Sequence, residues 1–333
     1  MRALAVIVIG SYCSGWAAVD ARSCYSTRPD RREQTSSVPD LSAILIQLFA
    51  GLSRGMVLFL LSAGLSLIFG VMNILNFAHA TFWLLAGYIT VTIYNYLLGY
   101  FEPGFYLLIP AVVAATAIMI VVGLVVERFL IRRMYNRELA EQLLLTFALV
   151  LILGDVIKLI WGVENRRIFV PVTPVEAFGA FINPYYFFLI GAGLAVAIGL
   201  WVFLHRTKYG KIVRAAVYSR EMVSALGIRI PLIYAGVFAA GIGIAAFAAG
   251  IFSPLLPMAL GVDIDIIIQC FAVVVIGGFG SILGTFVASL LVGVVYSFSI
   301  LLWPDGALAV IFLIVIAVLT WRPWGLFGTE LRS

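Results

Sequence analysis

The sequence predicts an all-α integral membrane protein, a polytopic bundle of about eight or nine transmembrane helices with one helix broken. Of the 333 residues, 63% are hydrophobic and only 11% are charged, whereas a soluble domain carries about 25% charged residues. The mean hydropathy is +1.13. No apolar run shows the two-residue alternation of a membrane barrel, so we expect helices to span the membrane.

Residues 1–42 differ from the rest of the chain. Arg2 and the apolar run after it resemble the start of a signal peptide, and Val19–Ala21 is a candidate cleavage site. A misassigned start codon explains the same residues equally well. We expect this extension to be disordered and residues 43–328 to form the membrane domain.

Apolar runs long enough to span a bilayer, which takes about 20 residues, then follow along the chain. They cover residues 43–70, 75–99, 105–127, 142–162, 185–204, 232–253, 264–300 and 304–321. The run 264–300 is long enough to cross twice, which leaves the helix count open between the two values.

Basic residues set the expected orientation. Lys and Arg gather in 128–137, in 206–229 and after the last span, and such loops face the cytoplasm. The regions 163–184 and 254–263 then face the other side, which is the periplasm in a Gram-negative cell. The same rule accounts for the formal net charge of +5, so we expect no nucleic acid as partner.

A polar cluster stands inside an uncharged run. Asn73, Asn76, His79 and Thr81 lie near the middle of residues 55–101, which hold no Asp, Glu, Lys or Arg. If helical, Asn73, Asn76 and His79 would share one broad face. Two interpretations stay open: a loop at the membrane surface with amides capping helix ends, or a helix broken inside the membrane.

Two further stretches stand out. Gly277, Gly278, Gly280 and Gly284 cluster in an apolar run, which favours close packing of backbones or a helix break where something must pass. Residues 206–231 form a long basic loop, in which we expect one amphipathic helix from Lys211 to Leu226. Its predicted apolar contacts are Ile212, Ala215, Ala216, Met222, Val223 and Leu226, and Gly227 would end it. A helix lying in the membrane interface would have the same pattern.

Together these stretches resemble the permease subunits of ATP-binding-cassette importers for branched-chain amino acids, the H-type member of the heterodimeric pair. The family's "GxxxxINFAHGE" segment stands here as "GVMNILNFAHAT", Gly70 to Thr81. Its cytoplasmic loop motif stands as Gly210, Lys211, Arg214, Ala215, Ala225, Gly227 and Ile228. Its "GGxGSxxG" segment stands as Gly277, Gly278, Gly280, Ser281 and Gly284.

The chain also departs from the family. Ala80-Thr81 replaces the usual Gly-Glu after the histidine, which removes a carboxylate, and Ser219 replaces an acidic or amide residue in the loop. Relatives in this family carry urea and short amides as well as amino acids. The resemblance therefore implies a permease for branched-chain amino acids or similar small polar solutes, with a urea or short-amide permease as the alternative.

The resemblance implies two sets of site residues and several partners. A substrate pathway would include Asn73, Asn76, His79, Thr81, Gly277, Gly278, Gly280 and Ser281. Contact with the ATPase would include Gly210, Arg214, Ala215, Glu221, Ala225 and Gly227. The partners would be ATPase subunits that bind ATP, a second permease subunit and a periplasmic solute-binding protein, with the chain itself multi-pass in the inner membrane.

Motifs for chemistry are not found in the sequence. It contains no phosphate-binding loop G-x-x-x-x-G-K-[ST] and no metalloprotease or hydrolase motif, so we expect no enzyme activity and no cofactor or metal in this chain. The competing class is a self-contained secondary transporter or channel, which usually buries charges for ion coupling. Asp155 and Lys158 are the nearest such pair, and we expect them to form a local ion pair.

Overall fold

The computed structural model describes residues 41–135, 137–177 and 180–328. The predicted N-terminal extension therefore lies almost entirely outside the described residues, and its nature stays a prediction. The chain divides into two units, Met1–Asp40 and Leu41–Ser333. The description that follows concerns the second unit.

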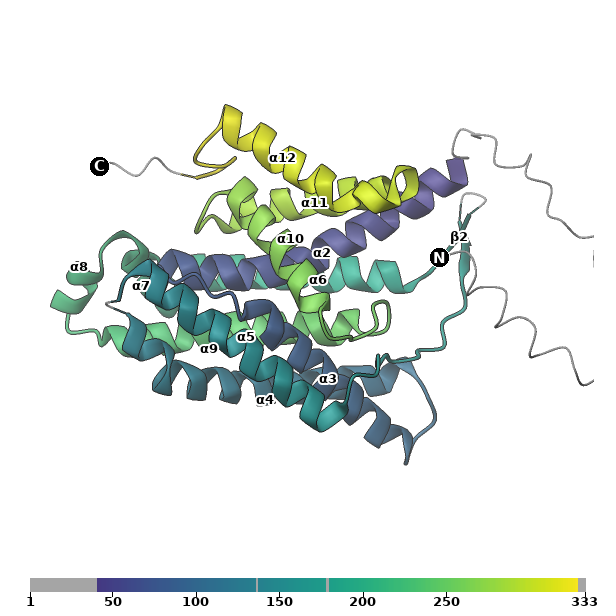
Figure 1. The fold of residues 1–333 in the computed structure, drawn as a ribbon, viewed down its shortest axis with the longest axis horizontal. Helices are drawn as coiled ribbons and strands as arrows, with labels where there is room; N and C mark the ends of the chain where they lie inside the picture. The colour runs from purple at the N-terminus through teal and green to yellow at the C-terminus, as the bar shows by residue number, and fades with distance from the viewer. Residues whose placement is uncertain (1–40, 136, 178–179, 329–333) are drawn as a thin grey trace, which may run out of the picture. The chain divides into compact units, whose positions relative to one another are not determined.

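Helices make up most of the described part of this unit, as predicted (Figure 1). The elements are α2 (Leu41–Met72), α3 (His79–Leu98), α4 (Phe105–Phe129), η1 (Ile131–Met134), α5 (Leu139–Trp161), β1 (Val175–Ala177), β2 (Ala180–Ile182), α6 (Tyr185–Arg206), α7 (Lys208–Tyr218), α8 (Arg220–Ala225), α9 (Ile230–Phe252), α10 (Val262–Gly277), α11 (Ile282–Leu302), η2 (Pro304–Gly306) and α12 (Ala307–Trp321). The two strands pair antiparallel, with Glu176 opposite Phe181.

Among the described residues, eight helices are long and apolar enough to cross a membrane, which confirms a polytopic bundle. Helix α10 is not one of them, because its 16 residues rise only about 24 Å against a hydrocarbon core of about 30 Å. The run 264–300 is indeed divided, since α10 and α11 are separate helices.

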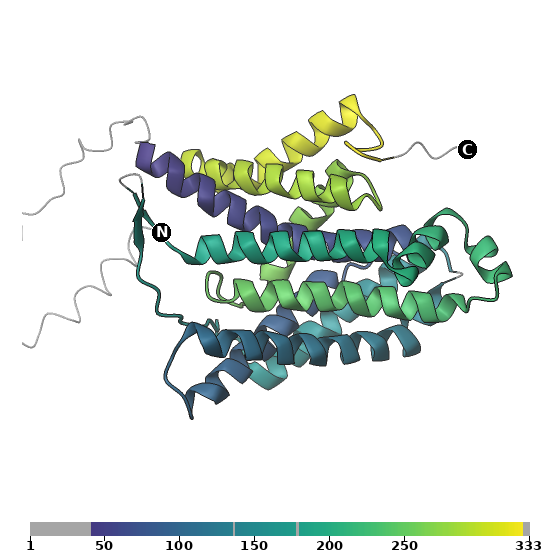
Figure 2. The same ribbon diagram turned by 180° about the vertical axis from the view of Figure 1, so that it is seen from behind.

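Helix α2 is the centre of the bundle, and it packs against α6, α9, α10 and α11 (Figures 1 and 2). Small residues bring α2 and α11 close together. A Cβ placed on Gly55 would lie 2.9 Å from the Ser289 carbonyl oxygen, and one on Gly51 would lie 2.8 Å from the Cα of Val294. Glycine at these positions lets the backbones approach, as is usual between membrane helices.

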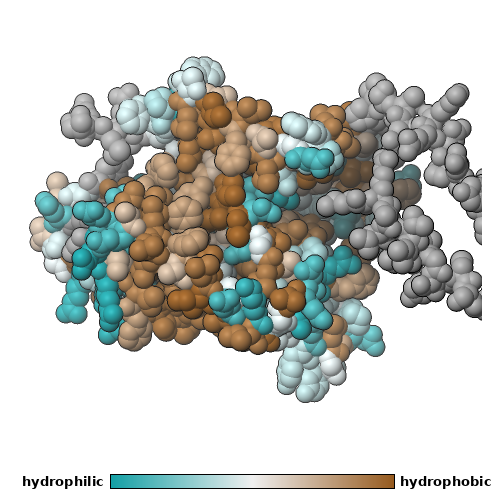
Figure 3. All heavy atoms as spheres, in the orientation of Figure 1, coloured by the Kyte–Doolittle hydropathy of each residue, from teal (hydrophilic) through white to brown (hydrophobic). Residues whose placement is uncertain are grey.

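The two ends of the bundle differ in composition. Helices α7 and α8 lie at one end, and the β1–β2 hairpin lies at the other (Figures 1 and 2). Hydrophobic side chains cover much of the middle of the face shown in Figure 3, and hydrophilic residues gather at the end with α7 and α8. The basic loops 128–137 and 206–229 meet at that end, because both line one cleft, as their shared cytoplasmic assignment requires.

Candidate functional site

The polar cluster begins where α2 breaks. Helix α2 ends at Met72, and Asn73 adopts a left-handed backbone with φ of 55°, a conformation in which asparagine is enriched. Residues 73–78 are not helical, and the helix resumes as α3 at His79. Asn73, Asn76 and His79 therefore do not share the face of one continuous helix.

The break leads the chain back into the bundle. The His79 imidazole Nε2 lies 3.1 Å from the carbonyl oxygen of Leu61, a residue that precedes Met72 by eleven positions. At about 1.5 Å per residue, this contact lies about 16 Å from the end of α2. His79 and Asn76 are both 0% exposed, so these two members of the cluster lie inside the bundle, whereas Asn73 is exposed.

Asn76 has an unusual environment. Neither amide atom of its side chain has a hydrogen-bond partner among the described residues. Its backbone carbonyl accepts from the backbone N–H of His79 at 3.2 Å, and Thr146 on α5 donates to the neighbouring Leu75 carbonyl at 3.4 Å. A buried, unpaired amide is costly, which makes Asn76 the member of the cluster best suited to meet a solute or water.

Thr81 lies against a carboxylate that sequence reasoning missed. Its hydroxyl donates to Asp263 Oδ2 at 2.7 Å, and Asp263 is a buried residue in the first turn of α10. The carboxylate that the Ala80-Thr81 replacement removes from α3 is thus supplied next to Thr81 by α10. Residues 55–101 contain no charged residue, yet a carboxylate reaches the polar cluster because two helices far apart in sequence meet there.

Arg54, near the middle of α2, was also missed. Its guanidinium donates to Gln269 Oε1 on α10 at 3.1 Å and lies 4.1 Å from the centre of the Tyr296 ring on α11. No described carboxylate forms a salt bridge with it. The sequence did contain a signal for Arg54, which is a single cation inside the predicted span 43–70. Charges inside a membrane are functional candidates by default.

The glycine segment lies against the start of the polar segment. A Cβ on Gly70 would be 3.0 Å from the Gly280 Cα, and the rings of Phe69 and Phe279 lie 4.5 Å apart. The two motifs of the sequence therefore meet, where α2 ends and α10 turns into α11. Gly280 has a φ of +76°, which explains why a glycine stands there.

Backbone packing accounts for the neighbouring residues of this segment. A Cβ on Gly277 would lie 2.5 Å from the Gly284 carbonyl carbon, and one on Gly278 would lie 2.5 Å from the Gly328 nitrogen. Ser281 caps α11 by accepting from the Gly284 backbone N–H at 3.1 Å. The packing alternative is confirmed for these residues, and a place on the transport path stays a prediction.

The loop 206–231 forms two helices rather than the single helix predicted. Helix α7 ends at Tyr218, and α8 begins at Arg220, with Ser219 between them in an extended conformation. The Ser219 hydroxyl accepts from the Met222 backbone N–H at 3.2 Å, because serine favours capping over a helix interior. Gly227, with φ of +80°, follows the end of α8 as expected.

The apolar residues of this loop divide into two groups. Val213, Ala216 and Val223 are buried, whereas Met222 is 72% exposed and Leu226 is 77% exposed. The other predicted contact residues, Arg214, Ala215, Glu221 and Ala225, are exposed as well. Gly210 is instead buried in the corner where α6 turns into α7, and a Cβ there would lie 2.5 Å from the Leu204 Cα.

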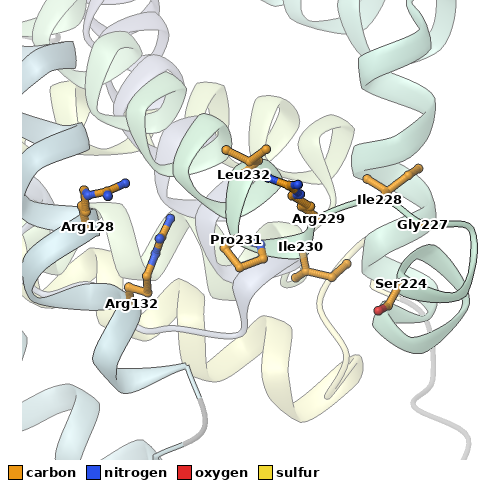
Figure 4. Close-up of a pocket in the computed structure, with 9 residues that line it drawn as sticks. All are labelled: Arg128, Arg132, Ser224, Gly227, Ile228, Arg229, Ile230, Pro231 and Leu232. Atoms are coloured by element: carbon orange, nitrogen blue, oxygen red, sulfur yellow. The ribbon is translucent and has the colours of Figure 1, made fainter.

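A cleft of about 620 Å³ opens beside this loop. Arg128 and Arg132 reach into it from α4 and η1, and Arg229 faces them from the segment before α9 (Figure 4). Arg132 also forms a salt bridge of 3.3 Å with the buried Glu127. Tyr135 donates to Glu127 as well, and burial, followed by this hydrogen bond, raises the pKa of Tyr135, so its hydroxyl remains a donor.

A second cleft, of about 460 Å³, lies at the opposite end. Residues 167–173 line one wall, and Pro254 and Leu255 lie on another. Backbone bonds between Arg166 and Met258, of 3.0 and 2.7 Å, join the two loops. The regions predicted to face away from the cytoplasm therefore come together.

Comparison with known proteins is consistent with this arrangement. Residues 47–319 match the family model described as "Branched-chain amino acid transport system / permease component". The chain belongs to this family. With eight apolar helices in the part of the chain that the structure describes, it is a multi-pass permease subunit of the inner membrane.

Curated relatives cover nearly the whole chain. It is similar to the high-affinity branched-chain amino acid transport system permease protein BraD of Pseudomonas aeruginosa, with 26% identity over 87% of this chain and 98% of the relative. The high-affinity branched-chain amino acid transport system permease protein LivH of Escherichia coli K12 is 25% identical over 85% of this chain and 95% of the relative. A probable branched-chain amino acid transport permease LivH of Methanocaldococcus jannaschii is 24% identical over 83% and 90%. No solved structure matches the chain.

Proposed function

We propose that the chain is a membrane-spanning subunit of an ATP-binding-cassette importer that carries branched-chain amino acids or similar small polar solutes. Separate ATPase subunits bind ATP and supply the work, and a periplasmic binding protein delivers the solute. The relatives' names support the solute class, since they are permease proteins of branched-chain amino acid transport.

The exposed face of α7 and α8 is the observation that carries this proposal. Three buried side chains anchor the loop to the bundle, while Met222, Ala225 and Leu226 project apolar surface outward. Exposed apolar side chains on a short helix, next to basic residues, favour docking onto another protein. We assign this face as the ATPase contact.

The broken helix supports a solute path through the same chain. Asn76, His79 and Thr81 bring an amide, an imidazole and a hydroxyl to the interior, where polar groups need partners. The same features occur in transporters that bind solutes at discontinuous helices. The glycine segment Gly277–Ser281 lies against the start of this region, since a Cβ on Gly70 would lie 3.0 Å from the Gly280 Cα.

The ATPase contact can be tested with Ala225→Arg. An added cation on the docking face places an unpaired charge in a packed contact, so we expect ATPase co-purification and solute-stimulated ATP hydrolysis to fall together. Thr173→Arg is the matched control, because Thr173 is also exposed but lies by the cleft at the opposite end.

Comparison of the two variants separates an effect on ATPase docking from a general effect of an added surface cation. The control should retain both the ATPase and its activity. Normal co-purification and normal stimulated hydrolysis with Ala225→Arg would refute the assignment of this face.

A self-contained secondary transporter is the second candidate, and the buried Asp263 beside Thr81 is the observation that favours it, since buried carboxylates couple ions in such proteins. Uptake into proteoliposomes containing the complete complex distinguishes the two. The proposed importer requires ATP and is insensitive to a protonophore. Uptake by this chain alone, abolished by the protonophore, would establish the secondary transporter instead.

A further inference from the structure

A small cavity adjoins Arg54 in the interior of the bundle. Its volume is about 10 Å³, close to the space one water molecule occupies. Arg54, Val57 and Leu61 of α2 line it, together with Trp83 of α3, and Phe252 and Ile266 add apolar walls from α9 and α10. The cavity thus lies where four helices meet.

Two of the residues that line the cavity carry hydrogen-bond donors with no described partner. They are Arg54 Nε and Trp83 Nε1, and both atoms are buried. Trp83 is 0% exposed. Nitrogen donors without acceptors are rare in protein interiors because each costs free energy. The remaining walls are aliphatic or aromatic.

The charge of Arg54 favours a negatively charged ligand, which would also accept hydrogen bonds from these two donors. Gln269 and the Tyr296 ring hold the guanidinium. Asp265 on α10 is close enough to interact with its charge, but no described carboxylate forms a salt bridge with it. An arginine in a membrane span is expensive to keep, and a carboxylate is the group that its planar fork binds best.

We propose that Arg54 and Trp83 bind the carboxylate of an aliphatic solute while its hydrocarbon chain lies against Val57, Leu61 and Ile266. Arg54 is then the residue that selects carboxylate-bearing solutes over neutral ones such as urea. The proposal deepens the proposed transport function and rests on it. It also separates the amino-acid and urea alternatives.

Asp263 is a buried carboxylate on the same helix as Ile266. It lies one turn before Ile266 on the buried face of α10, so side chains at the two positions are neighbours. A positive group on one wall and a negative group one turn away suit a zwitterion better than an anion.

The cavity must enlarge to admit a solute, and α10 is the helix placed to move. Glycines with positive φ bound it at both ends, Gly261 at 95° and Gly278 at 93°. Such residues absorb backbone rotation at hinges. A shift of α10 would move Ile266 and Gln269 away from α2 and open the cavity.

The test measures ligand-induced thermal stabilisation of the purified full chain in lipid nanodiscs, where a ligand that binds the folded state raises the apparent Tm. The probes are L-leucine, isopentylamine, which lacks the carboxylate, and urea. We expect only L-leucine to stabilise the wild type. Arg54→Gln should weaken the apparent affinity for L-leucine at least about tenfold, because it removes a charge-assisted partner.

Three variants accompany Arg54→Gln. Arg54→Lys should retain part of the response, because it keeps the charge. Trp83→Phe should weaken the stabilisation by L-leucine, because it removes the indole N–H but keeps an aromatic side chain. This variant remains informative if the Arg54 variants do not fold. Lys158→Gln is the control, since it removes a cation of α5 whose side chain is exposed and paired with Asp155 at 3.1 Å.

The outcomes are distinct from those for the transport function. Equal stabilisation of wild type and Arg54→Gln by L-leucine would overturn the proposal, as would stabilisation by urea alone or no response of the wild type. Each of these results leaves the ATPase contact intact. Loss of ATPase binding concerns the proposed function and not this site.

Discussion

Single residues of this chain act through partners that lie far away in the sequence. His79 is one of the pathway residues predicted from the sequence. Its described hydrogen bond is to Leu61, eighteen positions earlier. Because a carbonyl oxygen only accepts, the His79 Nε2 carries the hydrogen. The imidazole therefore joins the first turn of α3 to the middle of α2.

We predict that His79→Ala lowers the stability of the protein by about 1–3 kcal/mol, since the buried Leu61 carbonyl loses its side-chain donor and the missing imidazole leaves a cavity. His79→Gln should restore part of the loss, because its amide can donate from a similar position. The apparent Tm in nanodiscs measures both changes.

His205→Ala provides the control for this prediction. His205 makes the same kind of contact, with Nδ1 2.9 Å from the Trp201 carbonyl oxygen, but on an exposed surface. Its replacement should change the Tm little. Equal effects of the His79 and His205 substitutions would show that the buried bond does not brace the break.

At the scale of elements, the two unusual motifs meet. The end of α2 and the turn between α10 and α11 touch through Gly70 and Gly280. Gly280 is constrained twice, by its φ of +76° and by this close approach. The break of α2 and the start of α11 are thus positioned by one contact between backbones.

We predict that Gly280→Leu destabilises the protein by more than the roughly 1–3 kcal/mol typical of overpacking, because strain at a positive φ adds to it. Assembly with partner subunits and solute uptake should both fall. Gly236→Leu on α9 is the matched control, since Gly236 is exposed and nothing would contact its Cβ. Normal assembly and uptake with Gly280→Leu would contradict the role assigned to this contact.

At the scale of the whole described unit, the ends of the bundle are chemically different. Arg128, Arg132 and Arg229 line the cleft beside α8, and the loops that carry the β1–β2 hairpin and residues 254–255 lie at the other end. The positive-inside rule then places α7 and α8 in the cytoplasm.

This orientation predicts opposite accessibility for two single cysteines. In a background lacking Cys13, Cys24 and Cys270, we expect Ser224→Cys to react with a membrane-impermeant thiol reagent only from the cytoplasmic side. We expect Thr173→Cys to react only from the other side. Labelling of both positions from one side would contradict the topology.

The amino-acid sequence by itself determined the class of the protein and its membrane spans. Composition and run length are local properties, and the cost of placing charge in hydrocarbon acts on each segment separately. The capacity of Gly227 to end a helix and the local pairing of Asp155 with Lys158 were predictable for the same reason. So was the break near Asn73, because the uncharged run exceeds the length of one span.

Only the tertiary structure decided which polar groups share the interior. Thr81 and Asp263 are 182 positions apart, and Arg54 and Gln269 are 215 apart. No local pattern brings such residues together, because helix packing and the re-entry of residues 73–78 depend on contacts across the whole bundle. The fold likewise decided which side of α7 is buried, since α7 turns at Gly210 against α6 and buries Val213 and Ala216.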